Sequence, residues 1–124
     1  MKLDKITFVI PSRNNLEFIE LAYKSIRALE ATHEVLVLDD ASTDNTWAWC
    51  KRIMAVDSDF ICYRNDPVNG RVGIVGMFDK GIEMARTDII MAFHADMVAC
   101  KDLDKNILKP VSYTHLTLPT ILRV

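Results

Sequence analysis

Four short apolar runs, separated by segments with helical spacing, constrain the fold of this chain most strongly. Each run is rich in β-branched or aromatic residues, as strands are; the runs are Ile6–Ile10, Glu34–Leu38, Phe60–Tyr63 and Ile89–Phe93. The second and fourth runs are apolar without alternation, which is typical of strands covered on both faces. Because parallel neighbours need crossover connections, strands that alternate with helices predict a mainly parallel sheet.

Helical segments fill the intervals between these runs. We expect helices after Asn14 or Asn15, from Ser42–Asp44 to about Val56, over Gly73–Ala85 and over Asp102–Leu108. On the second helix, Trp47 and Trp49 lie two residues apart and cannot share a face, so we expect Trp47 in the core and Trp49 partly exposed. The order of elements predicts an α/β fold, a three-layer sandwich with helices on both faces of the sheet.

Length and composition limit the number of domains and the classes of binding partner. With 124 residues, 50% of them hydrophobic, the chain has room for one domain with a core. We expect this domain over residues 1–110 and a tail outside it over residues 111–124. Fifteen basic and 17 acidic residues give a formal charge of -2, which supplies no broad positive field for a nucleic-acid backbone. Nucleic acid is therefore not an expected partner.

The cysteines and the amino-terminal segment bear on location. Cys50, Cys62 and Cys100 are odd in number, widely spaced and without a Cys-x-x-Cys pair, which argues against a disulfide framework and a zinc site. The run Ile6–Ile10 falls short of a signal-peptide core, and no segment has the length of a membrane span. We expect a cytoplasmic location, with membrane contact only through other regions of a longer parent protein, at the inner face.

Polar residues collect at the carboxyl ends of three predicted strands. The first strand is followed by Pro11, Ser12 and Asn14. The second is followed by Asp39 and Asp40, and the fourth by His94 and Asp96. Open parallel sheets bind ligands beyond the carboxyl ends of their strands, so we expect these residues to share one rim. A hard divalent cation, Mg²⁺ or Mn²⁺, takes carboxylate oxygens as ligands and bridges them to a diphosphate. The rim therefore predicts a site for a metal ion and a diphosphate.

Structural interpretations of the same residues remain open. Asp39 and Asp40 can instead cap the helix that begins near Ser42, Asp96 can be a turn residue, and His94 can be a hydrogen-bonded loop histidine.

Arg71 lies in a loop that leads into a helix, where a phosphate or base contact competes with the simpler role of a surface arginine. The glycines that follow the third strand form no dinucleotide-binding fingerprint, because that motif belongs directly after the first strand.

Three segments carry a resemblance to a known family. They are residues 9–15, residues 35–46 with the pattern Asp-Asp-x-Ser-x-Asp, and the helix end at residues 81–85 before a strand that ends in an acidic motif. Together they resemble family 2 glycosyltransferases of the GT-A fold, whose nucleotide-binding half is Rossmann-like. The similarity runs from about Ile6 to Lys109 and covers the amino-terminal half of such a domain.

This resemblance implies a UDP-sugar or other nucleotide-diphosphate-sugar donor, Mg²⁺ or Mn²⁺, and inversion at the anomeric carbon. It implies that Pro11 lies near the base, and that Asp39 and Asp40 contact base and ribose. Asp96 matches the last acid of the family's Asp-x-Asp metal motif. His94 departs from the first acid of that motif, although an imidazole also binds manganese.

The resemblance also implies what this segment lacks. The family's catalytic base, which deprotonates a saccharide or lipid acceptor, belongs to a later segment, so we expect no catalytic residue here and donor binding without turnover. From Val111 the sequence continues none of the family's motifs, and we interpret residues 111–124 as read-through at the end of a gene fragment.

Three other interpretations stay open. A related nucleotidyltransferase usually has a glycine-rich loop after its first strand, where this chain has Pro11-Ser12-Arg13-Asn14. A magnesium-dependent receiver domain of signalling proteins carries its acidic pair after the first strand, whereas here the pair follows the second. A binding or structural remnant without activity is the third.

Overall fold

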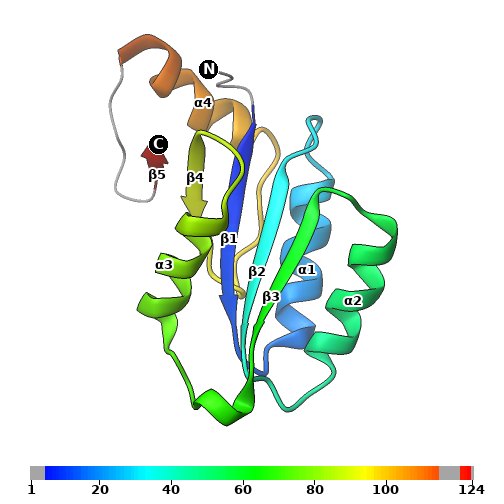
Figure 1. The fold of residues 1–124 in the computed structure, drawn as a ribbon. Helices are drawn as coiled ribbons and strands as arrows, with labels where there is room; N and C mark the ends of the chain where they lie inside the picture. The colour runs from blue at the N-terminus through cyan, green and yellow to red at the C-terminus, as the bar shows by residue number, and fades with distance from the viewer. Residues whose placement is uncertain (1–4, 115–120, 124) are drawn as a thin grey trace.

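The computed structural model of the chain describes residues 5–114 and 121–123. Strands and helices alternate along the chain (Figure 1). The elements are β1 (Ile6–Ser12), α1 (Leu16–Arg27), β2 (Glu34–Asp40), α2 (Thr46–Val56), β3 (Phe60–Asn65), the 3₁₀ helix η1 (Pro67–Asn69), α3 (Ile74–Met84), β4 (Ile89–Ala92), α4 (Leu103–Thr114) and β5 (Ile121–Arg123). The strand order is β3-β2-β1-β4-β5, with β1 to β4 parallel and β5 antiparallel to β4. The predicted α/β fold with a mainly parallel sheet is confirmed.

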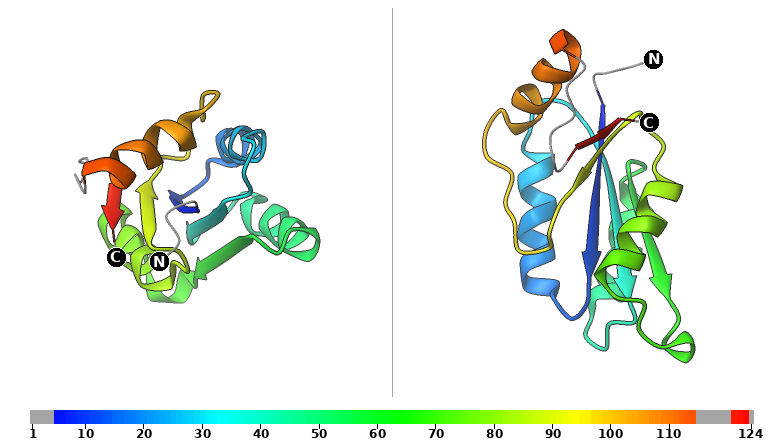
Figure 2. Two further views of the ribbon diagram at one scale, coloured as in Figure 1. Left: turned by 90° about the horizontal axis from the view of Figure 1, so that it is seen from above. Right: turned by 90° about the vertical axis from the view of Figure 1, so that its left-hand side faces the viewer.

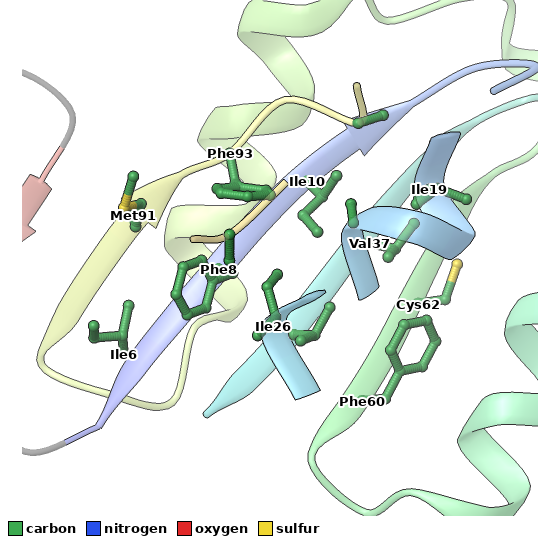
Figure 3. Packing of buried hydrophobic residues seen from close by; sticks show 14 of the residues in the cluster. Ile6, Phe8, Ile10, Ile19, Ile26, Val37, Phe60, Cys62, Met91 and Phe93 are labelled. Carbon is green, nitrogen blue, oxygen red and sulfur yellow. The ribbon is translucent and has the colours of Figure 1, made fainter. Parts of the chain in front are cut away.

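Both faces of the sheet are covered. Helices α1, α2 and α4 lie on one side of it and α3 lies on the other (Figure 2). Strand residues alternate between the two resulting cores: Phe8, Ile10 and Val37 pack with α1 and α2 (Figure 3), whereas Val9 and Leu38 pack with α3. This period of two is the pleat of a strand, and it decides which side each polar residue at a strand end faces.

Three strands and the last helix are longer than the sequence predicts. β1 continues through Pro11 to Ser12, β2 includes Asp39 and Asp40, β3 reaches Asn65, and α4 runs to Thr114. Pro11 fits a central strand for a geometric reason. The Val9 carbonyl faces β4, where it accepts the Phe93 N–H, and residues two apart face the same way. The nitrogen of Pro11 therefore points to the side where β4 has ended, and no ladder bond is lost.

The expectation for the two tryptophans is wrong. Trp49 is 7% exposed and packs edge-on against Tyr23 and Phe60. Trp47 is half-buried, and the cationic groups of Lys51 and Arg64 lie over its ring. Apolar residues recur at spacings of three and four from either tryptophan, so the pattern alone does not identify which face of α2 meets the sheet.

The tail predicted over residues 111–124 lies partly outside the described residues. The part that is described contributes the end of α4 and the strand β5. Among the described residues, no helix has the length and apolar character required to cross a bilayer. The domain boundary at residue 110 stays a prediction.

Gly81 sets how closely α3 approaches the sheet. A Cβ atom at this position would lie 2.2 Å from Cγ1 of Val9 and 3.1 Å from Cδ2 of Leu38, both in the core. We predict that Gly81→Ala lowers the free energy of unfolding by about 1–3 kcal/mol through overpacking, although alanine favours helices.

Gly76→Ala is the matched control, measured in the same urea titration. The neighbour of its Cβ would be the side chain of Val72, which is 49% exposed and free to rotate away. We expect this variant to be unchanged or more stable by up to about 1 kcal/mol. Equal effects of the two substitutions would show that the approach of α3 is not limited by Gly81.

Candidate functional site

The strand order places a topological switch point between β1 and β4. From β1 the chain adds β2 and β3 on one side and then returns to place β4 on the other. In open α/β sheets the crevice beyond the carboxyl ends at such a point is the usual ligand site. The carboxyl ends of β1, β2 and β3 meet at one edge, at the bottom of Figure 1.

A pocket of about 230 Å³ lies at this edge, on the side of α3. Its wall combines residues of β1, β2, the segment before α3 and α3 itself: Pro11, Ser12, Arg13, Asn15, Asp40, Arg71, Gly73, Ile74 and Met77. Four of the predicted site residues are therefore brought together, namely Pro11, Ser12, Asp40 and Arg71. By the alternation along β1, Ser12 shares the face of Ile10, which packs in the core on the side of α1.

Asp40 is buried and holds the segment before α3. Its Oδ1 accepts hydrogen bonds from Asn65 Nδ2 at 2.9 Å and from the Val72 N–H at 2.9 Å, and its Oδ2 accepts the Gly73 N–H at 2.8 Å. Burial alone raises the pKa of Asp40, but these hydrogen bonds and the charge of Arg71 outweigh it and leave the pKa below its ordinary value. Asp40 is therefore ionised at neutral pH.

Asp39 faces the opposite side of the sheet from Asp40, because consecutive strand residues alternate. It is fully buried. Its Oδ1 accepts the Ser42 N–H at 3.1 Å, and its Oδ2 accepts a hydrogen bond from Arg64 Nη1 at 3.1 Å. Asp39 does not border the pocket, and its visible role is to hold the entrance to α2.

Asn14 joins two loops at the same edge. Its N–H donates to Ser42 Oγ at 2.9 Å, and its side-chain Oδ1 accepts the N–H groups of Thr43 at 2.7 Å and Asp44 at 3.2 Å. The residue has a φ of 55°, a left-handed conformation that asparagine tolerates better than most residues. The N-cap of α1 is Asn15, without a capping side-chain hydrogen bond, so Asn14 fixes the β1–α1 turn and lies outside the pocket.

His94 and Asp96 lie in the exposed turn after β4. The His94 ring packs edge-on against Phe78 of α3, and the backbone N–H of His94 donates to Met97 Sδ at 3.4 Å. Neither residue borders the pocket that contains Asp40. Within residues 5–114 and 121–123, no group of three or more His, Cys, Asp or Glu side chains is placed to hold a metal ion. The metal assignment to these two residues stays a prediction.

Two residues at the end of β3 were missed by sequence reasoning. Arg64 and Asn65 are in register with Asp39 and Asp40, so each face of the sheet carries one acid beside one donor. The signal was present: a polar pair follows Tyr63 as another follows Leu38. Seeing it requires the register of β2 against β3, which the one-dimensional pattern does not contain.

The depressed pKa of Asp40 predicts a pH dependence of stability. Its hydrogen bonds stabilise the fold fully above the pKa of an unfolded aspartate, about 3.9, and this contribution is lost as pH falls through the lower folded value. Asp40→Asn places an N–H group against N–H donors, and we expect it to lower the free energy of unfolding at pH 7 by about 1–3 kcal/mol.

Urea unfolding of wild type and Asp40→Asn from pH 7 down to pH 3 measures this effect. The stability gap between the two proteins should narrow as pH falls, because only wild type loses the ionised carboxylate. Asp44 and Asp57, whose pKa values are also lowered, titrate in both proteins and cancel in the difference. A constant gap would contradict the assignment.

Comparison with known proteins gives one family and a set of solved structures. The family model described as Glycosyl transferase family 2 matches residues 7–122. S. aureus TarS, a fragment of which was solved with UDP-GlcNAc, shares 18% identity at a TM-score of 0.75, with 90% of this chain and 32% of that chain covered. The mannosyltransferase PcManGT from Pyrobaculum calidifontis, in complex with GDP-Man and Mn²⁺, shares 23% identity at a TM-score of 0.74, with 88% and 32% covered.

These structural likenesses show the GT-A fold. This chain spans about a third of the length of each of these solved structures. No curated protein matches its sequence significantly.

Proposed function

Because the chain belongs to glycosyl transferase family 2, we propose that it binds the nucleotide of a nucleotide-diphosphate sugar, with UDP as the nucleotide. In the parent protein this donor site would serve inverting transfer of the sugar to a saccharide or lipid acceptor. We also propose a cytoplasmic location, which the free thiols of Cys50, Cys62 and Cys100 support.

One observation carries this proposal: the pocket joins Pro11, Asp40 and Arg71, which come from three separate segments, at the carboxyl edge of the sheet. Ile74 and Met77 add an apolar wall on which a planar base can lie. A carboxylate has about four acceptor positions, and the described contacts of Asp40 use three of them. The remaining position is available to a ribose hydroxyl or a base N–H.

Two of the similar structures support a nucleotide-sugar donor. TarS was solved with UDP-GlcNAc and PcManGT with GDP-Man and Mn²⁺. Their nucleotides differ, so the choice of UDP for this chain rests on the family resemblance and is tested below against GDP.

His94 and Asp96 are the residues that would hold a divalent ion. Both side chains are exposed, which leaves coordination positions open to water and to the oxygens of a diphosphate. An imidazole beside a carboxylate suits Mn²⁺ better than Mg²⁺, which is held mainly by oxygen ligands. The bound ion would neutralise charge on the departing nucleoside diphosphate. The two residues supply at most two ligands, so water and the diphosphate would have to complete the coordination of the ion.

Calorimetric titration tests the donor site. We expect UDP to bind more tightly than GDP, and Mn²⁺ to strengthen binding in wild type but not in Asp96→Ala. Arg71→Ala should weaken UDP binding by about tenfold or more, because a charge-assisted contact is lost.

Glu83→Ala is the control, since it removes an exposed carboxylate of α3 outside the pocket and should leave the affinity unchanged. Binding that ignores both Mn²⁺ and Asp96→Ala would favour a remnant without a metal-dependent donor site. If GDP binds more tightly than UDP, only the choice of UDP as the nucleotide is overturned, and the proposed donor site stands.

We further propose that residues 1–124 transfer no sugar, because the family resemblance assigns the catalytic base to a later segment. The expected result is no release of UDP above the buffer rate when UDP-sugars, Mn²⁺ and saccharide or lipid acceptors are supplied together. Sustained UDP release that depends on an acceptor would refute this proposal and would place a base within the chain.

A further inference from the structure

We propose that Asn65, the last residue of β3, is a positioning residue for the nucleotide pocket and acts by fixing the backbone on both sides of Arg71. The proposal rests on the proposed binding of a nucleotide at this pocket. Asn65 does not border the pocket itself, so any effect on a ligand must pass through the residues that it holds.

The register of the sheet places Asn65 beside Asp40. The two residues are Cα partners in the parallel β2–β3 pair and point to the same face. Both are buried, at 3% and 4% exposure. Nδ2 of Asn65 donates one hydrogen bond to Asp40 Oδ1 at 2.9 Å and one to the Gly70 carbonyl at 2.7 Å, so both amide hydrogens are used.

Asp40 continues the connection on the other side of Arg71. Its two oxygens accept the N–H groups of Val72 and Gly73. Residue 70 is thus held by Asn65, and residues 72 and 73 are held by Asp40, which Asn65 also contacts. Gly70 and Gly73 have φ values of 71° and 89°, so this segment takes a path that few other residues would follow.

The side chain of Arg71 has little else to hold it. Among the described residues its guanidinium forms no ion pair, and the residue is exposed at the pocket rim. Its place in the wall therefore depends on the backbone around it. An amide at position 65 meets this requirement because it supplies two donors to two acceptors in a buried space, without adding a charge next to Asp40.

A double-mutant cycle separates positioning from general destabilisation. UDP affinity is measured without metal for wild type, Asn65→Ala, Arg71→Ala and the double variant. We expect Asn65→Ala alone to weaken UDP binding by about tenfold. This is the loss expected for the Arg71 contact, because the substitution displaces Arg71. In the Arg71→Ala background the same change should cost less than about twofold. Losses that multiply in the double variant would overturn the proposal.

Amide hydrogen exchange gives a readout that needs no ligand. In Asn65→Ala the amides of Val72 and Gly73 should lose protection, while that of Leu36 in the middle of β2 keeps it. Unchanged protection at Val72 and Gly73 would also overturn the proposal. If wild type binds no UDP at all, the proposed function fails, and the exchange result alone decides whether Asn65 holds this segment.

A charge variant provides a rescue test. In Asn65→Asp the new carboxylate has no hydrogen to donate to the Asp40 carboxylate or to the Gly70 carbonyl. The two neighbouring negative charges raise the pKa of the pair formed by the new carboxylate and Asp40. Arg71 is the charged group that faces this pair from the loop, and Arg13 borders the same pocket as Asp40. Arg64 and Asp39 lie on the other face of the sheet. UDP affinity should fall about tenfold at pH 7.5 and recover at pH 5, when a shared proton restores one donor.

The matched control for this rescue is Asn69→Asp, which makes the same change at an exposed position of η1. Its affinity for UDP should follow wild type at both pH values. A loss in Asn65→Asp that persists at pH 5 while the protein stays folded by circular dichroism would count against the proposal.

Discussion

The parallel alignment of β1, β2 and β3 at their carboxyl ends is the constraint on which the rest of the structure depends. It places Ser12 beside Asp39 and Asp40 beside Asn65 in register, so polar residues distant in sequence lie next to each other. Because side chains alternate along a strand, the two consecutive acids point to opposite faces. Asp39 then holds the entrance to α2 through Ser42, and Asp40 holds the segment before α3.

Most of the fold was predictable from the sequence, because alternating apolar runs and helical segments leave few topologies open. The boundaries were less predictable. Polar residues such as Asp39, Asp40 and Asn65 still extend their strands, since the ladder uses backbone groups and tolerates any side chain whose polar atoms find partners. The phase of α2 was misjudged at Trp47 and Trp49, because both tryptophans fit a spacing of three and four and only packing against Tyr23 and Phe60 distinguishes them.

The candidate site was predictable in part. The rule that ligands bind beyond strand ends identified Pro11, Ser12 and Asp40, which do meet at one pocket with Arg71, a residue predicted from its place in a loop before a helix. The rule says nothing of side-chain partners, which depend on register and on loop conformation. For this reason it missed Asn65, and it did not anticipate that the side chain of Asn14 would bridge to Thr43 and Asp44.

The hydrogen bonds of the two acids change the charge that a ligand meets. Asp39 is buried and forms an ion pair with Arg64, so its negative charge is compensated within the protein. The charged residues that border the pocket are Arg13, Arg71 and Asp40, and the Asp40 carboxylate already accepts three hydrogen bonds. The sequence places two acids at this rim, but in the fold the pocket is bordered by one acid and two arginines, which leaves it with a net positive charge. Under the proposed function, such a rim would attract an anionic nucleotide, and a cation at His94 and Asp96 would act on a different part of the same ligand.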